Sequence, residues 1–459
     1  MRVGSELVET APNRDPAAAG SAPRRTVLLV AYHFPPLRGS SGMQRTLRFA
    51  RHLPKFGWRP IVLSIDPGAY EETGETSGNE VPPELEVHRA FGFNAARKLS
   101  LFGRYPEWVA LPDRWANWRF WAVRKALRLI RSERIDAIWT TFPIATAHTI
   151  GRDVALRARI PWIAEFRDPM WQSDWPPEPA ANVAWKKLEK EIFTTANWVV
   201  FTAPSAVGMY TERFPEFGAS KIAVIENGYD EETFRRAEAA LRSRGEAAGP
   251  SSPAPGAAAS GAVRRAGPIT LLHSGIVYRS ERDPTQMFAA VAALKRKGLI
   301  GVDSLRIVLR ASGAEGNYQG DLERHDIADI VRLEPAIDYV AALNEMLTVD
   351  GLLLLQAANC NAQIPAKLYE YLRARRPILA LTDPTGDTAR TLDAAGAGLI
   401  ARLDSAADIE AALPRFLEQI RAGTARMPTD STVARYSREA QSGELATLLE
   451  KAVSGVATR

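Results

Sequence analysis

Short apolar runs alternate with amphipathic helical stretches along most of this chain. The runs fall at 26–31, 60–64, 136–141, 161–166 and 197–202, and again at 269–274, 305–310, 351–356, 377–382 and 397–401. Each run has the length of a buried strand, and strands that alternate with helices form parallel sheets with helices on both faces. The pattern therefore predicts an α/β fold with two doubly wound, Rossmann-like domains that face each other across a cleft.

A segment with little to bury separates the two groups of runs. Residues 243–268 consist mainly of Ala, Gly, Pro and Ser, as in a linker or a long surface loop. We therefore expect one domain over 25–242 and a second over 269–429, since 459 residues exceed what one hydrophobic core usually organises. Residues 1–24 lack the apolar core of a secretory signal and are expected to be a disordered tail. Residues 430–459 are expected to form a helix that crosses back to the first domain.

Charge and cysteine content limit the partners and the compartment. A formal net charge of +5 favours anionic partners such as phosphates or a membrane surface, and we expect no nucleic acid partner. The single cysteine, Cys360, excludes an internal disulfide and a cysteine-cluster metal site, which fits a reducing, cytoplasmic compartment. No apolar run of about 18 residues occurs, so we expect no segment that spans a bilayer.

Two strand ends of the first domain carry polar side chains. The loop YHFPPLRGSSGMQR places Gly39 and Gly42 just before a helix whose free backbone amides could face an anion, although a turn that merely requires glycine fits equally well. The stretch WIAEFRDPMW places Arg167 and Asp168 at another strand end. Asp168 could orient a hydroxyl or assist proton movement, or the two residues could form only a local ion pair in a turn.

The first strand of the second domain is followed by a basic loop, GIVYRSERDP. Asp283 and Gln286 resemble the start of a capped helix, which places Arg282 just outside a helix N-terminus. Together with Arg279 and the turn at Gly275, this arginine could hold a phosphate. The alternative is a loop with two solvated arginines.

The stretch QIPAKLYEYLRARRPILAL, residues 363–381, predicts another helix at a strand end of the second domain. Lys367 and Glu370 lie three residues apart and so share one helical face, which a surface ion pair would explain. If they face the cleft instead, the carboxylate could accept hydrogen bonds from both hydroxyls of a ribose and the lysine could neutralise a phosphate.

A tryptophan-rich segment of the first domain precedes a basic helical face. It suits a membrane interface or a lipid-linked acceptor, because indole rings settle at headgroup depth and cations meet anionic lipids. A core-packing helix with a solvated basic face explains the pattern equally well. The residues concerned are Trp115, Trp118, Trp121, Arg124, Lys125 and Arg128.

The chain from Arg25 onward resembles the GT-B glycosyltransferases, in particular the bacterial sugar transferases of family 4. The resemblance rests on FPPLRGSSGMQR, on NGYD at 227–230, on GIVYRSERDP and above all on IPAKLYEYLRARRPILAL. It implies a nucleoside diphosphate sugar as donor, with Glu370 on the ribose, and with Arg282 and Arg279 on the diphosphate. It also places Lys367 near the diphosphate or the sugar and closes the Gly39–Gly42 loop against the donor.

The sequence departs from the family pattern at two places. Position 362 is Ala where a second glutamate commonly contacts the donor sugar, which leaves Asn361 and Gln363 as neutral replacements. Ile276 follows Gly275 where an arginine is common.

The resemblance implies transfer of a hexose-like sugar, with retention of configuration, to a lipid-linked or polysaccharide acceptor in cell-envelope glycan biosynthesis. Arg282, Lys367 and Asp168 are the expected catalytic residues, no metal or other cofactor is expected, and the protein would lie in the cytoplasm or peripherally on the inner membrane face. Two alternatives remain at this point: a nucleotide-sugar epimerase on the same fold, and a degenerate nucleotide-binding scaffold of a polysaccharide assembly complex.

Overall fold

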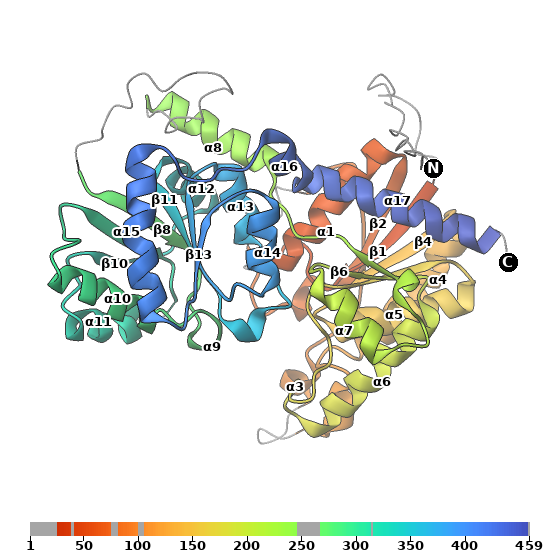
Figure 1. The fold of residues 1–459 in the computed structure, drawn as a ribbon. Helices are drawn as coiled ribbons and strands as arrows, with labels where there is room; N and C mark the ends of the chain where they lie inside the picture. The colour runs from red at the N-terminus through yellow and green to blue at the C-terminus, as the bar shows by residue number, and fades with distance from the viewer. Residues whose placement is uncertain are drawn as a thin grey trace, which may run out of the picture.

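The computed structural model describes residues 25–37, 41–74, 81–99, 105–245, 267–313 and 315–457. The expected tail over 1–24, most of the expected linker and Gly39 lie outside the described residues. The fold consists of two parallel α/β domains, which lie side by side (Figure 1).

A seven-stranded parallel sheet forms the first domain, in the order β3-β2-β1-β4-β5-β6-β7. Its register pairs Leu28 of β1 with Ile61 of β2. The strands are β1 (Arg25–Val30), β2 (Trp58–Ile65), β3 (Glu86–Ala90), β4 (Ala137–Thr141), β5 (Trp162–Phe166), β6 (Trp198–Phe201) and β7 (Ile222–Val224). The helices up to β7 are α1 (Ser41–His52), α3 (Ala95–Lys98), α4 (Trp118–Ser132), α5 (Ala145–Ala158), α6 (Pro179–Thr195) and α7 (Ser205–Arg213).

The second domain contains a six-stranded parallel sheet in the order β10-β9-β8-β11-β12-β13. Its strands are β8 (Ile269–Ser274), β9 (Leu305–Arg310), β10 (Val331–Glu334), β11 (Gly351–Leu355), β12 (Ile378–Leu381) and β13 (Leu399–Ala401). The helices between and after them are α9 (Arg279–Arg282), α10 (Thr285–Arg296), α11 (Glu315–Arg324), α12 (Tyr339–Thr348), α13 (Lys367–Ala374), α14 (Asp387–Ala394) and α15 (Ala406–Ala422).

Two sheets with helices on both faces confirm the predicted fold class. In the first domain, α4 to α7 pack on one face and α1 on the other. In the second domain, α10, α11 and α15 share one face, and α12, α13 and α14 share the other. All ten predicted strands are present; β3, β7 and β10 were not predicted, because short or polar edge strands such as EVHRA and VRLE carry no apolar run.

Two helices pack on one domain although their positions in the sequence associate them with the other. α8 (Glu231–Ser243) precedes residue 269, yet its buried residues Phe234, Ala237 and Leu241 pack with the core of the second domain. The structure thus differs from the expected boundary at 242. After α16 (Asp430–Arg435), α17 (Arg438–Ala457) packs Leu445 and Leu449 against the first sheet. Both crossings are visible in Figure 1, α8 over the second domain and α17 over the first.

The two crossing segments are joined to each other and the domains also touch directly. The backbone amide of Tyr229 donates to the carbonyl of Tyr436 at 3.1 Å, and Arg438 donates to the carbonyl of Tyr229 at 2.9 Å. The NGYD element therefore forms part of the connection between the domains. At the N-terminus of α7, Ser205 donates from its backbone amide and its hydroxyl to the buried carboxylate of Asp387, at 2.9 and 2.8 Å.

Candidate functional site

A cavity of about 290 Å³ lies between the two domains, at the carboxyl ends of their strands. Its walls come from loops after β1, β4 and β5, from α1 and the NGYD element, from the α9 region, from the segment before α13 and from the start of α17. Ligands of open α/β sheets bind at such strand ends. The lining residues are His33, Arg45, Pro143, Arg167, Asp168, Asn227, Glu281, Arg282, Gln356, Cys360, Gln363, Ile364, Pro365, Ala366 and Arg438.

The cavity contains more cations than anions. Arg167, Arg282 and Arg438 line it together with Asp168 and Glu281. Burial lowers the pKa of Arg167 and of Arg438 to about 10, so both remain charged at neutral pH. A buried, positively charged cavity of this kind suits an anion such as a diphosphate.

Arg282 reaches the cavity from the short helix α9, where it is held by its neighbours. Its Nη1 donates to the carbonyl of Ile276 at 2.9 Å, and its guanidinium lies over the ring of Tyr278, 5.5 Å from the centroid. Its Nε is buried and has no acceptor among the residues that the structure describes. A phosphate oxygen in the cavity could satisfy that donor.

Lys367 begins α13 and meets a buried histidine of β8. Its Nζ lies 3.0 Å from Nε2 of His273, whose Nδ1 lies 2.9 Å from the carbonyl oxygen of Leu353. Since a carbonyl only accepts, Nδ1 carries the ring hydrogen and Nε2 accepts from the lysine. Burial, then the charge of Arg282, lowers the pKa of Lys367 to about 7, while Glu370 opposes the shift.

The turn after β8 approaches the ammonium group of that lysine at Gly275. Gly275 has φ +120°, and a Cβ built there would lie 2.9 Å from Nζ of Lys367. Gly275 therefore touches Lys367, and Arg282 lies close enough to influence the charge of that lysine. Arg282 lines the cavity, whereas Gly275, Lys367 and Glu370 are not among its lining residues.

Glu370 lies one helical turn after Lys367 and is held by a tyrosine. The hydroxyl of Tyr339, at the start of α12, donates to Oε1 of Glu370 at 2.6 Å. Burial raises the pKa of Glu370, and the bond from Tyr339 counteracts that rise. Among the described residues, Oε1 is the carboxylate oxygen that accepts a hydrogen bond, which leaves the second oxygen for a ligand hydroxyl.

A buried ion pair forms the floor of the cavity on the first-domain side. Arg45 of α1 makes two bonds of 2.9 Å with the carboxylate oxygens of Glu165 on β5. The same guanidinium donates to the carbonyls of Ile225 and Glu226 at 2.7 and 2.8 Å. Both charged side chains are almost completely buried, so this pair fixes α1 to the end of β5.

Arg167 and Asp168 follow β5 and face the cavity. Arg167 Nη2 lies 3.2 Å from Nδ1 of His33, and burial and the arginine lower the pKa of His33 to about 3, so the ring is neutral and accepts. A Cβ at Gly42 would collide with the Arg167 guanidinium, so this glycine admits the arginine. Burial, and in addition the charge of Glu281, raises the pKa of Asp168, which makes this carboxylate a better proton acceptor than an ordinary aspartate.

Of three further residues predicted to bind the donor, one lines the cavity and two do not. Gln363 lines the cavity. Asn361 donates to Asp383 at 2.8 Å and is not among the lining residues. Arg279 pairs with Asp321 at 3.1 Å and likewise does not line the cavity. Its predicted contact with a diphosphate would require this ion pair to break.

The tryptophan-rich segment divides between core and surface. Trp118 is completely buried in the core of the first domain, so the prediction that it contacts an acceptor or a membrane is wrong; its position at the start of α4 faces the sheet. Trp115 packs against that core beside Tyr32, at 4.5 Å between ring centroids. Trp121 is exposed, as are Arg124 and Arg128, whereas Lys125 is half-buried and donates to the carbonyl of Arg89.

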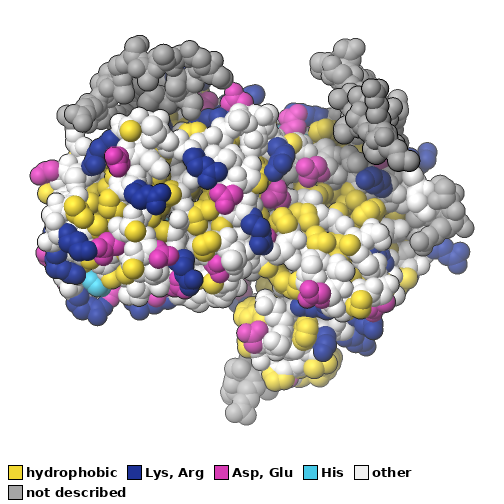
Figure 2. All heavy atoms as spheres, viewed as in Figure 1, with side chains coloured by type: hydrophobic (Ala, Val, Ile, Leu, Met, Phe, Trp, Pro, Cys, Tyr) yellow, Lys and Arg dark blue, Asp and Glu magenta, His cyan; other side chains and the backbone are white. Residues whose placement is uncertain are grey.

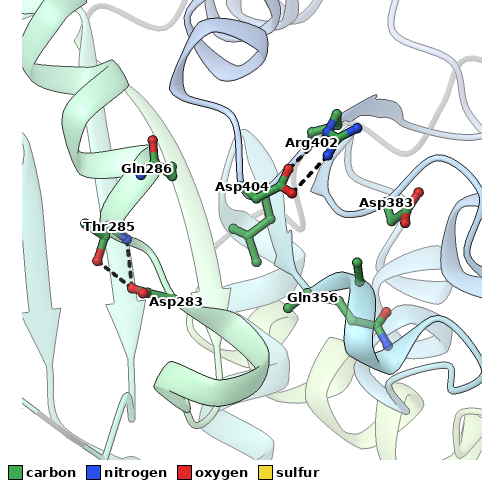
Figure 3. Close-up of a pocket in the computed structure, with 10 residues that line it drawn as sticks. Asp283, Thr285, Gln286, Gln356, Asp383, Arg402 and Asp404 are labelled. Carbon is green, nitrogen blue, oxygen red and sulfur yellow. Dashed lines mark hydrogen bonds and ion pairs between the residues drawn. The ribbon is translucent and has the colours of Figure 1, made fainter.

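Two further cavities lie away from the interface of the domains. One, of about 310 Å³, lies at the ends of β11, β12 and β13, where Arg402 bonds Asp404 and Asp283 accepts from Thr285 (Figure 3). Gln356 separates it from the cavity between the domains. The other is an open groove of about 1040 Å³ between α5 and α6. Neither combines residues from both domains. A cavity of about 440 Å³ beside α14 does, with Glu226, Asp387 and Arg390 in its lining. We take the cavity of about 290 Å³ as the candidate site because it brings together Asp168, Arg282 and Gln363, which the sequence had indicated.

The described residues contain no group of three or more His, Cys, Asp or Glu side chains that could hold a metal ion. Within the same residues, none of the helices has both the length and the apolar character needed to cross a bilayer.

The chain is similar to known glycosyltransferases in part of its sequence and in its fold. Residues 41–233 match Glycosyltransferase Family 4. The chain has the two-domain GT-B fold, and its first domain is similar to the family 4 glycosyltransferases. Sucrose-phosphate synthase from Thermosynechococcus elongatus has a similar structure, with a TM-score of 0.61 and 15% identity, over 94% of this chain and 100% of that one. No curated protein matches the sequence.

Other GT-B structures are similar at lower identity. HepE from Anabaena, solved in complex with UDP and glucose, has a TM-score of 0.58 and 12% identity, over 93% of this chain and 100% of that one. The lipopolysaccharide outer core galactosyltransferase WaaB, in its apo form, has a TM-score of 0.55 and 9% identity, over 93% and 99% of the two chains. At these identities the similarity shows the shared GT-B fold alone.

Four residues of this GT-B site were missed by the sequence interpretation: Arg45, His273, Tyr339 and Arg438. Arg45 and Arg438 belong to helices that read as ordinary amphipathic segments, and only the contact of α1 and α17 brings them to the cavity. His273 could have been noticed, because a histidine interrupts the apolar run ITLLHS of a buried strand. Tyr339 follows a strand that was not predicted.

Proposed function

We propose that this protein transfers a sugar from a nucleoside diphosphate sugar to an acceptor hydroxyl. The observation that carries the proposal is the cavity between the domains, where Arg167, Arg282 and Arg438 converge from three separate elements. HepE, a protein of the same fold, binds UDP and UDP-glucose. A donor of that class fits the charge of the cavity and the carboxylate beside it.

The donor would lie along the second domain. Glu370 would accept hydrogen bonds from the ribose through the oxygen that Tyr339 leaves free. Arg282 and Lys367 would hold the diphosphate, with Gln363 near the sugar. Arg282 and Gln363 line the cavity, and Lys367 and Glu370 interact electrostatically with Arg282 and Arg438 of its lining, which supports a single extended ligand.

Catalysis would be mainly electrostatic. When the bond between the sugar and the diphosphate breaks, negative charge accumulates on the departing phosphate, and cations already in place stabilise that charge more in the transition state than before it. Arg282 and Lys367 would act in this way. Asp168, on the opposite wall, would orient the acceptor hydroxyl, and its raised pKa suits a residue that handles a proton.

The acceptor and the stereochemistry follow from the family resemblance. We propose a lipid-linked or polysaccharide acceptor of cell-envelope glycan biosynthesis, transfer with retention of configuration, and a peripheral position at the inner membrane face. The site needs no metal for the roles given above.

Thermal unfolding in the presence of UDP, ADP and GDP sugars tests the donor assignment. A ligand that binds only the folded state raises the apparent melting temperature, so one nucleotide class should stabilise the protein and Arg282→Gln should abolish the shift. Arg332→Gln serves as the control, because this exposed arginine lies in the same domain, outside the cavity. The proposal fails if none of the nucleotides changes the melting temperature.

Transfer is tested separately with a radiolabelled donor and a membrane lipid extract. Labelled lipid that forms with the wild type and not with Arg282→Gln supports the transferase. Nucleotide binding without any transfer supports the scaffold, and an isomerised sugar formed without acceptor supports the epimerase.

A further inference from the structure

Three aromatic side chains form an exposed patch on the outside of the first domain. Phe91, Phe120 and Trp121 are 52%, 53% and 38% exposed. The ring of Trp121 contacts both phenylalanines, with centroid distances of 4.8 Å to Phe91 and 5.1 Å to Phe120. We refer to these three residues as the aromatic patch. Exposed apolar contacts of this kind are unusual for a surface that meets only water.

The helix beneath the aromatic patch is strongly basic. α4, WRFWAVRKALRLIRS, contains five basic residues and no acidic one. The guanidinium of Arg124 lies over Phe120, 3.7 Å from the ring centroid. Arg124, Arg128 and Arg131 are exposed, and no carboxylate of the described residues pairs with them. Their charges are therefore free to meet an external anion.

We propose that the aromatic patch and the arginines of α4 form a docking surface for an anionic lipid bilayer. Aromatic rings settle at the level of lipid headgroups, and neighbouring arginines are attracted to anionic lipids. The ring geometry disfavours stacked nucleic acid bases, because the rings pack edge to face and Arg124 covers one face of Phe120. A partner protein would need acidic residues opposite α4 and is an outcome of the test.

The position of the aromatic patch connects it to the candidate site. Phe91 directly follows β3, at the same sheet edge at which His33 follows β1 and Asp168 follows β5. A bilayer bound there would lie beside the cleft edge of the first domain. In Figure 2, hydrophobic side chains gather on the lobe that carries α3, which extends from this edge.

This inference deepens the proposed function, on which it rests for its purpose, because it favours an acceptor that is itself anchored in lipid. It also corrects the sequence prediction of the contact surface. Trp118 lies in the core and Trp115 packs against it, while Phe91 and Phe120, which the sequence interpretation did not single out, occupy the exposed positions.

Sedimentation with lipid vesicles tests the surface on the whole protein. We expect binding to vesicles of phosphatidylglycerol and phosphatidylcholine, and little binding to phosphatidylcholine alone. Arg124→Gln with Arg128→Gln should weaken binding about twenty-fivefold, because each cation near an anionic surface contributes about fivefold. The control, Arg332→Gln with Arg415→Gln, removes the same charge from exposed positions of the second domain and should bind normally.

The apolar part is tested in parallel. Phe91→Ser with Trp121→Ser should weaken vesicle binding at least about tenfold, since it removes two of the three aromatic side chains that would enter the bilayer. The control is Leu299→Ser with Val302→Ser, which are 61% and 47% exposed in the second domain. The melting temperature without ligand, measured on each variant, shows whether the variant is folded.

The outcomes separate the two proposals. Equal binding of the patch variants and the wild type, or binding only to a protein in pull-down experiments, overturns the docking surface. A protein that responds to nucleotides but not to vesicles keeps the proposed function and loses this inference. A protein that binds vesicles through the aromatic patch but never responds to nucleotides keeps the docking surface and loses the proposed function.

Discussion

The ammonium group of Lys367, at the start of α13, lies 3.0 Å from Nε2 of His273, near the carboxyl end of β8. Burial and the charge of Lys367 lower the pKa of His273 well below its ordinary value, so the ring stays neutral and acts as the acceptor. The charged groups that influence Lys367 are Arg282, which disfavours the ammonium, and Glu370, which favours it. The lysine is thus held in place but can lose its proton near neutral pH.

Nucleotide binding should therefore weaken as the pH rises above 7. The pKa of Lys367 is about 7 without ligand, and a bound diphosphate would raise it, so binding takes up a proton above pH 7. The affinity should fall by up to about tenfold per pH unit until the raised pKa is reached. Calorimetry at pH 8 in two buffers with different ionisation enthalpies measures the uptake. Lys367→Met should bind without it, and unchanged uptake in this variant would contradict the assignment.

Gly275→Ala should weaken nucleotide binding, an effect that its loss of stability alone does not explain. Its Cβ would lie 2.9 Å from Nζ of Lys367 and would push the lysine away from the cavity. Gly298→Ala is the matched control, because Gly298 also has a positive φ, +67°, but open space around its Cβ. Both variants should lose about 1 to 2 kcal/mol of stability, and only Gly275→Ala should raise the dissociation constant, by about tenfold. Equal dissociation constants would place Lys367 outside the ligand contacts.

Glu370→Gln tests the ribose contact. The carboxylate can accept two ribose hydrogen bonds, and a neutral amide accepts them less strongly, so nucleoside diphosphate binding should weaken about tenfold. The wild type should prefer the ribonucleotide over its 2′-deoxy analogue, and Glu370→Gln should lose most of this preference. Tyr339→Phe should have a smaller effect, because Tyr339 orients the carboxylate without replacing it. If the preference for ribose survives in Glu370→Gln, this glutamate does not bind the ribose.

Glu165→Gln should destabilise the first domain. Without this carboxylate, Arg45 would remain buried with neutral acceptors alone, the carbonyls of Ile225 and Glu226 and the side-chain oxygen of Asn227. Leaving a buried charge without its partner costs about 3 to 5 kcal/mol. The free energy of unfolding in urea measures the loss. Glu133→Gln, which breaks a more exposed pair with Arg59, should cost no more than about 1 kcal/mol, and comparable losses in the two variants would contradict this account.

The sequence could predict the fold because strand runs, helix periods and a composition break all indicate two α/β domains. It could also indicate Lys367, Glu370 and Arg282, since these residues lie at strand ends, where the topology itself brings ligands. Helix α8 shows where this reasoning stops. Its chain position associates it with the first domain, but the apolar face of Phe234, Ala237 and Leu241 finds its partners in the second.

Residues that reach the site from other elements were beyond sequence reasoning. Arg438 opens α17, and the sequence contains no sign that this helix returns its N-terminus to the cavity. For Trp118 and Trp121, three residues apart, the helical period does not say which one faces the core; the sheet decided that question. Asn361 likewise donates a hydrogen bond to Asp383, which follows the neighbouring strand β12 and could not be identified as its partner from the sequence.

The return of α17 to the first domain has a consequence for synthesis of the chain. One face of the first sheet, including Val27 and Leu29 of β1, is covered by Leu445, Leu448 and Leu449 of that helix. While the ribosome is still making the second domain, this face is covered only by α1 and the turn that follows it. The first domain can therefore complete its core only after the second has been translated, and until then its apolar surface depends on transient contacts or on chaperones.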